Sequence, residues 1–291
     1  MKLSTLFEQG KFVVTGEIGP PKGCHLGHLM HEAEEYLSRV DGINVTDLQA
    51  AAMRVGSLVS CKRLLEHNLN PILQVVCRDR NRISLQSELL GAAEFGVDNV
   101  LCLTGDHNIL GDHPDSMPVF DLDSVSLIRA GQTLMAGKDM AGNDLEGDPP
   151  SLCLGCVVNP GADPVEPQII KLKKKADAGA NFCQTQAVYD VDVYARFKEA
   201  ADKAGITIPI MAGLVMLKSA GMAKYMNRMV AGVFVPPNLV QRMTDTDDKP
   251  KTSIEITVEL MSGLKPYCDG IHIMSLGWDQ YVPAVLDGAG L

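Results

Sequence analysis

The sequence predicts a (β/α)8 barrel, a TIM barrel, formed as a single domain over residues 1–291. Three observations indicate this class. Eight short apolar runs recur along the chain, each run is continuously apolar rather than alternating, and helical periods lie between them. Continuous apolar character is typical of parallel strands that are buried on both faces. Strands that alternate with helices indicate an α/β architecture, and the chain length suits one barrel.

The expected strands follow one another along the whole chain. They are expected at residues 12–16, 42–46, 71–77, 97–105, 151–158, 180–186, 207–215 and 269–276. The alternative class is an open, doubly wound sheet. It is disfavoured because no G-x-G-x-x-G motif opens the first strand-to-helix turn.

Apolar residues at a period of 3.6 predict helices between the strands. The stripes are Leu29, Ala33, Tyr36, Leu37 and Val40; Leu58, Cys61, Leu64 and Leu65; Leu85, Leu89, Ala92 and Ala93; and Val193, Phe197, Ala200, Ala201 and Ala204. Segments 105–121 and 137–150 are rich in turn-forming residues and predict loops. A third irregular stretch is expected at 235–251, before the last helix. No linker divides the chain.

The composition argues against several partners. A formal net charge of −10 leaves no basic stripe for nucleic acid or an anionic membrane surface. No run of 18 apolar residues is present, so no membrane span is expected, and the first residues do not resemble a signal peptide. Most of the eight cysteines lie inside apolar runs, which indicates free thiols in a reducing cytoplasm.

Two motifs have spacings that are also found in metal sites, but the expected positions of their side chains argue against a metal site at either one. Cys153 and Cys156 form a C-x-x-C inside an expected strand, where positions i and i+3 face opposite sides. His25, His28 and His31 are expected to drift around a helix, and no carboxylate partner is evident in the sequence, which favours a solvated face. No metal site is predicted.

Glu17 is a lone acid near the end of the first apolar run, followed by Ile18, Gly19, Pro20 and Pro21. Prolines hold the preceding chain extended. The pattern therefore predicts a rigid carboxyl group in a mostly apolar pocket, where burial favours the protonated form and permits proton donation. The alternative is a strand that stops at a turn, with Glu17 in solvent.

Polar residues also follow the other expected strands, where barrel enzymes carry their chemistry. They are Thr46 and Asp47, Thr104 to Asp106, Asn159, and Gln184 to Gln186. This ring contains acids and little positive charge. Asp106 by itself could equally be a turn or N-cap residue. The lysines at 171 and 173–175 could equally form a solvated helix face.

At these positions the sequence resembles the methylenetetrahydrofolate reductase family. The resemblance rests on GEIGPP at 16–21, LTGD at 103–106, KLKKKADAGANFCQTQ at 171–186 and YDVDVYARF at 189–197, and it covers about residues 10 to 280. It implies a barrel with a flavin across the carboxyl-terminal mouth. It also implies the reduction of 5,10-methylenetetrahydrofolate to 5-methyltetrahydrofolate.

The resemblance implies roles for individual residues. Glu17 matches the general acid for opening the folate ring, Asp106 the carboxylate beside the flavin and the pterin, and Gln186 a folate contact. Flavin contacts are implied for Thr46, Thr104, Gly105, Asp106, Phe120, Asp121, Gly155, Asn159 and Lys175, of which Lys175 would reach the phosphates.

The sequence departs from the family at several positions. Thr104 replaces an arginine, Gln168 an acid and Gly155 an aromatic residue, which leaves FMN and FAD as alternatives. Ala220 replaces a phenylalanine that packs over the flavin, which argues against direct use of NADH. The chain resembles the short, anaerobic one-carbon-pathway type, which works with a second, metal-containing subunit. Some family members form homo-oligomers.

Three functional hypotheses follow. The first is a flavin-dependent folate reductase. The second is a reductase subunit that is active only in complex with an electron-delivering metalloprotein. The third is an unrelated barrel lyase that uses Glu17 and a Schiff base on Lys175.

Overall fold

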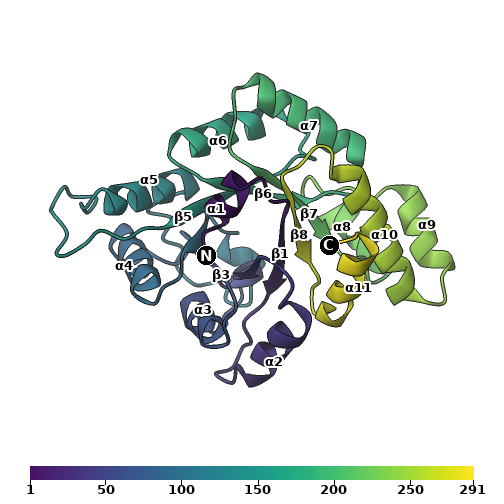
Figure 1. Ribbon diagram of the computed structural model, residues 1–291, viewed down its shortest axis with the longest axis horizontal. Helices are drawn as coiled ribbons and strands as arrows, with labels where there is room; N and C mark the ends of the chain where they lie inside the picture. The colour runs from purple at the N-terminus through teal and green to yellow at the C-terminus, as the bar shows by residue number, and fades with distance from the viewer.

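The computed structural model describes residues 1–291 and shows a closed barrel of eight parallel strands in chain order (Figure 1). All eight expected strands are confirmed, with ends that differ by a few residues. They are β1 (Val13–Ile18), β2 (Gly42–Val45), β3 (Pro71–Val76), β4 (Asn99–Leu103), β5 (Cys153–Val158), β6 (Phe182–Ala187), β7 (Ile210–Val215) and β8 (Gly270–Met274).

Helices surround the barrel (Figure 1). One helix of the outer layer follows each strand: α2 (Gly27–Tyr36), α3 (Ser57–Glu66), α4 (Arg82–Glu94), α5 (Ser124–Met135), α6 (Glu166–Asp177), α7 (Val191–Lys203), α10 (Lys249–Leu264) and α11 (Val282–Gly288). Three further helices are α1 (Leu3–Glu8), which precedes β1, and α8 (Ala220–Met229) and α9 (Pro237–Asp245), which lie between β7 and α10. None of the helices has the length and apolarity needed to cross a membrane.

The expectation of an irregular stretch at 235–251 is wrong. This segment contains α9 and the start of α10, and α11 rather than α10 is the last helix. The signal is weak because α9 buries only Leu239 and Met243, one helical turn apart, within a polar sequence. A smaller difference concerns α2, which ends at Tyr36, so Leu37 is buried just beyond the helix.

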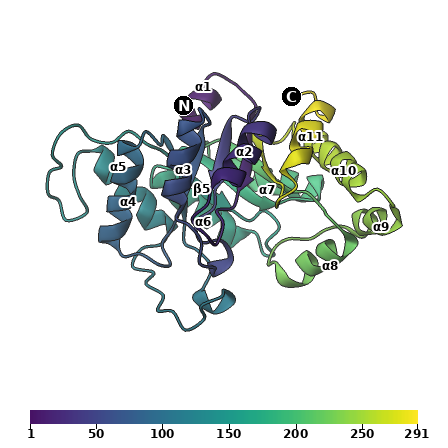
Figure 2. The ribbon, with the colours of Figure 1, turned by 90° about the horizontal axis from the view of Figure 1, so that it is seen from below.

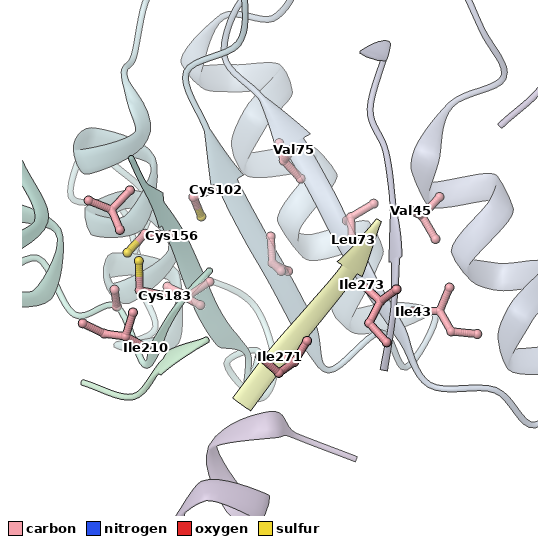
Figure 3. Packing of buried hydrophobic residues seen from close by; sticks show 14 of the residues in the cluster. Ile43, Val45, Leu73, Val75, Cys102, Cys156, Cys183, Ile210, Ile271 and Ile273 are labelled. Carbon is pink, nitrogen blue, oxygen red and sulfur yellow. The ribbon is translucent and has the colours of Figure 1, made fainter. Parts of the chain in front are cut away.

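The outward faces of the strands form the main core against the helices. Figure 3 shows this layer, with Val75, Cys102, Cys156 and Cys183 among its members. Cys153 lies instead in the cluster inside the barrel, which confirms that the two cysteines of the C-x-x-C face opposite sides of β5. Burial raises the pKa of the Cys102 and Cys183 thiols, so they stay protonated and act as small apolar side chains.

The inside of the barrel is closed at one end by α1. Leu3 and Leu6 of this helix pack against inward-facing residues near the start of the strands: Val13, Ile72, Leu101, Cys153, Phe182 and Met211. Figure 2 shows α1 at the end of the molecule that also carries both chain termini, whereas α8 lies toward the other end. The carboxyl-terminal ends of the strands therefore remain available for a site.

Candidate functional site

A cavity of about 170 Å³ lies inside the barrel at the carboxyl-terminal ends of the strands. Its polar residues are Glu17, Gln74, Gln184, Thr185, Gln186 and His272, and its apolar residues are Leu101, Leu103, Val157, Val158 and Met274. The structure thus brings Glu17 and Gln186, two of the expected site residues, into one cavity. Both come from strands, β1 and β6, whose inward positions are set by the period of two.

Glu17 is mostly buried, with 12% of its side chain exposed. Its Oε2 accepts a hydrogen bond from Gln74 Nε2 at 3.3 Å and lies 3.6 Å from His272 Nε2. The expectation of a mostly apolar pocket is therefore wrong for the carboxyl group itself. The reason is strand alternation: Ile18 points outward into the main core, while Glu17 points inward among polar side chains.

The two prolines do hold the chain after Glu17. Pro20 O accepts a hydrogen bond from Arg54 Nη1, and Pro21 O accepts one from Val55 N, so the segment is tied to the connection before α3. The chain after β1 is thus hydrogen-bonded to this connection, while Gln74 of β3 and His272 of β8, rather than the prolines, contact the carboxyl group.

A buried polar network lies directly beneath Glu17. Thr15 Oγ1 is 2.9 Å from His272 Nδ1, Asn44 Nδ2 is 3.2 Å from His272 Nε2, and Asn44 also donates to Gln184 Oε1 at 2.6 Å. Gln184 Nε2 donates to Thr15 Oγ1 at 3.2 Å. Buried polar groups are costly unless they are paired, and these four pair with one another. The network holds the imidazole ring of His272 in place.

Sequence reasoning missed Asn44, Gln74 and His272. A signal was present, because each is a polar residue inside an otherwise apolar strand, in GINV, PILQVV and GIHIM. The continuous apolar runs predict strands that are apolar on both faces, whereas in the structure the inner face becomes polar toward the mouth. A polar residue at the inward position of a buried parallel strand is the pattern that could have found them.

Asp106 lies outside the cavity, in the loop that follows β4. It is exposed, and its carboxylate makes no hydrogen bond or ion pair within the protein. Its carbonyl oxygen accepts a hydrogen bond from Arg78 Nη1, and Arg78 Nη2 donates to Leu48 O. Arg78 is only 3% exposed and thereby joins the loops after β2 and β4. The carboxylate is free, but no contact connects it to Glu17.

The same two loops pack closely at the mouth. Leu48, Ala50 and Ala51 have φ values of 46°, 55° and 55°, which are unfavourable for residues with a side chain. A Cβ atom at Gly111 would lie 1.9 Å from Ala51 O, so only glycine permits this approach. Gly105, also with a positive φ of 92°, packs against Val76 and Arg78. The backbone of these two loops at the rim of the site therefore adopts conformations and close contacts that few other residues would permit.

Three other residues that are expected to contact a flavin form contacts with neighbouring residues of the protein. Thr104 Oγ1 accepts a hydrogen bond from Ser124 N at the start of α5. Asp121 forms an ion pair with Arg82, whose side-chain and backbone N–H groups lower the pKa of Asp121 to about 2. Phe120 stacks on His107, with ring centroids 6.2 Å apart. These residues organise the 105–121 loop and the starts of α4 and α5.

Gly155 and Asn159 also have structural partners. A Cβ atom at Gly155 would lie 2.3 Å from Phe182 Cζ, so the aromatic ring occupies the space beside this glycine inside the barrel. Gly155 does not line the cavity. Asn159 Nδ2 donates to Ala231 O at 2.8 Å, and its Oδ1 accepts from Gly161 N. Asn159 therefore connects the end of β5 to the segment after α8.

Lys175 lies on α6, outside the barrel wall. It is 8% exposed, and its Nζ donates to Val157 O at 2.6 Å. It does not line the cavity that contains Glu17. The arrangement therefore does not bring together the two groups that a lyase with a Schiff base on Lys175 would use, and it gives that hypothesis no support.

The residues near the mouth fit the ring system of a flavin. Thr46 is 2% exposed, and its Oγ1 is buried without a hydrogen-bond partner. An unpaired buried hydroxyl is costly and is commonly explained by a ligand or water. Leu103, Val157 and Met274 offer apolar walls beside the amides of Gln74 and Gln186. Such a mixture is typical of small-molecule sites.

The family model described as methylenetetrahydrofolate reductase matches residues 2–290. A 5,10-methylenetetrahydrofolate reductase of Pectobacterium carotovorum is 26% identical, over 84% of this chain and 77% of that protein. Methylenetetrahydrofolate reductase 2 of Schizosaccharomyces pombe is 25% identical, over 81% of this chain but only 38% of that protein. The chain thus spans well under half of the longer relative.

Among solved structures, the chain is similar to an uncharacterized protein from Clostridium thermocellum that binds two copies of 5-methyl-5,6,7,8-tetrahydrofolic acid. The TM-score is 0.65 and the identity is 18%, over 98% of this chain and 97% of that chain. A 2,3-dimethylmalate lyase has a TM-score of 0.52 at 11% identity, over 100% of this chain and 89% of that chain. At these identities the likeness shows the barrel fold alone.

The match of the family model extends over almost the whole chain. Together with the closed barrel and the relatives of that name, it establishes the family. The chain belongs to the methylenetetrahydrofolate reductase family of oxidoreductases.

Proposed function

We propose that the protein is a flavin-dependent reductase that converts 5,10-methylenetetrahydrofolate to 5-methyltetrahydrofolate. One observation carries the proposal: a carboxyl group, Glu17, and two amides, Gln74 and Gln186, converge in a cavity at the mouth of a barrel of this family. The names of the relatives and the folate ligand of the structural neighbour support a folate substrate.

Glu17 is the general acid in this proposal. The five-membered ring of the substrate opens to a 5-iminium cation only when N10 is protonated, and a positioned carboxyl group supplies that proton. Glu17 suits this role because it is mostly buried at the end of a strand and faces the cavity. A rigid strand holds a reacting group more closely than a loop does.

Asp106 and Gln186 bind and stabilise the substrate. The carboxylate of Asp106, which has no partner within the protein, supplies negative charge near the cation that forms when the ring opens. Gln186 Oε1 accepts a hydrogen bond from Ala187 N at 3.0 Å, which leaves its amide N–H groups for the folate. These roles follow the family resemblance.

The flavin, when bound, supplies the hydride for the reduction. Thr46 would hold its ring through the unpaired hydroxyl, and Gly105 would contact it through the backbone. The phosphate contact implied for Lys175 would require Nζ to leave the carbonyl of Val157. FMN and FAD are the two alternatives for this site.

A second candidate is a reductase subunit that receives electrons from a metal-containing protein partner. The observation that favours it is Ala220, the first residue of α8, which offers no aromatic ring at the position where the resemblance implies one. The eight free cysteines support a reducing compartment such as the cytoplasm for either candidate.

The test is an absorbance spectrum of the purified protein, followed by anaerobic addition of 5-methyltetrahydrofolate and, in a fresh sample, NADH. Bleaching of the flavin band by methyltetrahydrofolate is the expected result. Bleaching by NADH as well would contradict the partner-dependent candidate. A protein that binds no flavin, alone or after incubation with FMN or FAD, would overturn the proposed function.

A further inference from the structure

Two residues contact the same oxygen atom of Glu17. Gln74 Nε2 donates to Oε2 at 3.3 Å, and His272 Nε2 lies 3.6 Å from Oε2. No protein group forms a hydrogen bond or an ion pair with Oε1. The two oxygens of this carboxyl group are therefore not equivalent, because other protein side chains contact only Oε2.

We propose that Gln74 and His272 are positioning residues that fix Oε2 of Glu17, so that Oε1 is the atom that gives its proton to the substrate. The inference rests on the proposed role of Glu17 as general acid. A protonated carboxyl group has one O–H donor, and its other oxygen accepts. Because the N–H of Gln74 requires an acceptor, Oε2 is the accepting oxygen and the acidic proton belongs on Oε1.

Both positioning residues are held rigidly. Gln74 is 8% exposed and His272 4% exposed. Ser57 Oγ donates to the backbone carbonyl of Gln74 at 3.0 Å, which ties β3 to the start of α3. Thr15 and Asn44 contact the two nitrogens of the His272 ring. The carboxyl group of β1 is thus oriented from β3 and from β8, and neither contact depends on a loop.

This orientation affects the rate more than the affinity. Proton transfer requires the O–H to point at the substrate nitrogen, and small errors of placement reduce rates strongly. A carboxyl group released from Gln74 could rotate and present either oxygen, while the other residues that line the cavity would stay in place. Loss of Gln74 should therefore lower the limiting rate and leave the half-saturating concentration of substrate nearly constant.

The experiment is a double-mutant cycle on Gln74→Met and Glu17→Gln. Flavin-loaded protein is reduced with dithionite and mixed with 5,10-methylenetetrahydrofolate, and the return of the flavin band is followed. The reduction by dithionite removes any dependence on the natural electron donor. Gln74→Met retains the length of the side chain and loses the N–H donor. Gln241→Met, on the exposed face of α9, is the matched control.

Gln74→Met is expected to lower the limiting rate about 10- to 100-fold. The half-saturating substrate concentration, the affinity for 5-methyltetrahydrofolate in equilibrium binding and the melting temperature should change little. In the Glu17→Gln background the same substitution should have no further effect, because it acts only through that carboxyl group. Gln241→Met should behave as the parent does.

Two outcomes would overturn the inference alone: a normal rate for Gln74→Met in an active protein, or an equal fold-loss with and without Glu17. If Gln74→Met does not fold, the same double-mutant cycle is measured with Gln74→Leu, which also lacks the N–H donor, and the same two outcomes apply. A parent protein that binds folate and flavin but reduces nothing would overturn the proposed function and this inference with it.

Discussion

At the amino-terminal end, the inside of the barrel is filled by apolar side chains, whereas at the carboxyl-terminal end it is lined by a carboxyl group, amides and an imidazole around a cavity. The same strands build both ends. Phe182 and Gln186 lie on β6, and Val13 and Glu17 lie on β1, all facing inward. The end closed by α1 contributes packing, and the open end carries polar groups with unused hydrogen-bonding capacity.

A polar layer separates the two ends. Thr15, Asn44, Gln184 and His272 are at most 4% exposed and satisfy one another through hydrogen bonds. One barrel can thus place its stability and its chemistry on different layers of the same strands. Substitutions at the two ends should therefore affect different measurements.

The largest effect is expected at the open end. Glu17→Gln removes the acidic proton and should slow folate reduction by about 10²- to 10⁴-fold, the usual contribution of a general acid. The melting temperature should stay close to that of the parent, since the amide can still occupy the site beside Gln74. Normal production of methyltetrahydrofolate by this variant would contradict the role of Glu17.

At the closed end, Phe182→Ala should act on stability instead. Phe182 is fully buried, and its truncation should cost about 3–5 kcal/mol, which a shift of the urea unfolding midpoint would measure. The polar layer lies between this ring and the cavity, so the half-saturating folate concentration of the folded variant should not change. An unchanged midpoint would show that the closed end does not carry this stability.

Gly155→Ala distinguishes two roles of this residue, because the family resemblance implies a cofactor contact and the packing implies a structural role. The added Cβ would lie 2.3 Å from Phe182 Cζ, and such overpacking should cost about 1–3 kcal/mol. A second substitution, Phe182→Leu, should relieve part of that cost and show coupling between the sites. If folded Gly155→Ala loses flavin affinity while its stability is normal, the cofactor role is supported instead.

The smallest effect is expected at Asp121, on the rim. Its pKa is lowered to about 2 by Arg82, below the usual value of 3.8, so its ionised form stabilises the fold above pH 4. That contribution is lost as the pH falls through the folded value. Asp121→Asn should therefore lower the melting temperature slightly at pH 7, and the two proteins should converge near pH 2.

High salt should reduce the difference at neutral pH, because the Asp121–Arg82 pair is exposed. A difference that persists undiminished at pH 2 would contradict an electrostatic origin. A matched measurement of flavin affinity at pH 7 tests the ribityl or phosphate contact that the resemblance implies for Asp121.

Local patterns in the sequence predict the order of the strands and most of the helices correctly. Local periodicity carries that information, because neighbouring residues decide which faces can be buried. It also placed Glu17 at a strand end and Cys153 and Cys156 on opposite faces of β5. It failed at α9, where two buried residues make too short a stripe to recognise.

Contacts between side chains from distant parts of the sequence depend on the tertiary structure. Gln74 reaches Glu17 from 57 residues further along the chain, and His272 reaches it from near the other terminus. Lys175 Nζ donates a hydrogen bond to the carbonyl of Val157, and the ring of Phe182 fills the space beside Gly155. The physical reason is that barrel closure and strand register set these contacts, and neither is encoded in any local stretch of sequence.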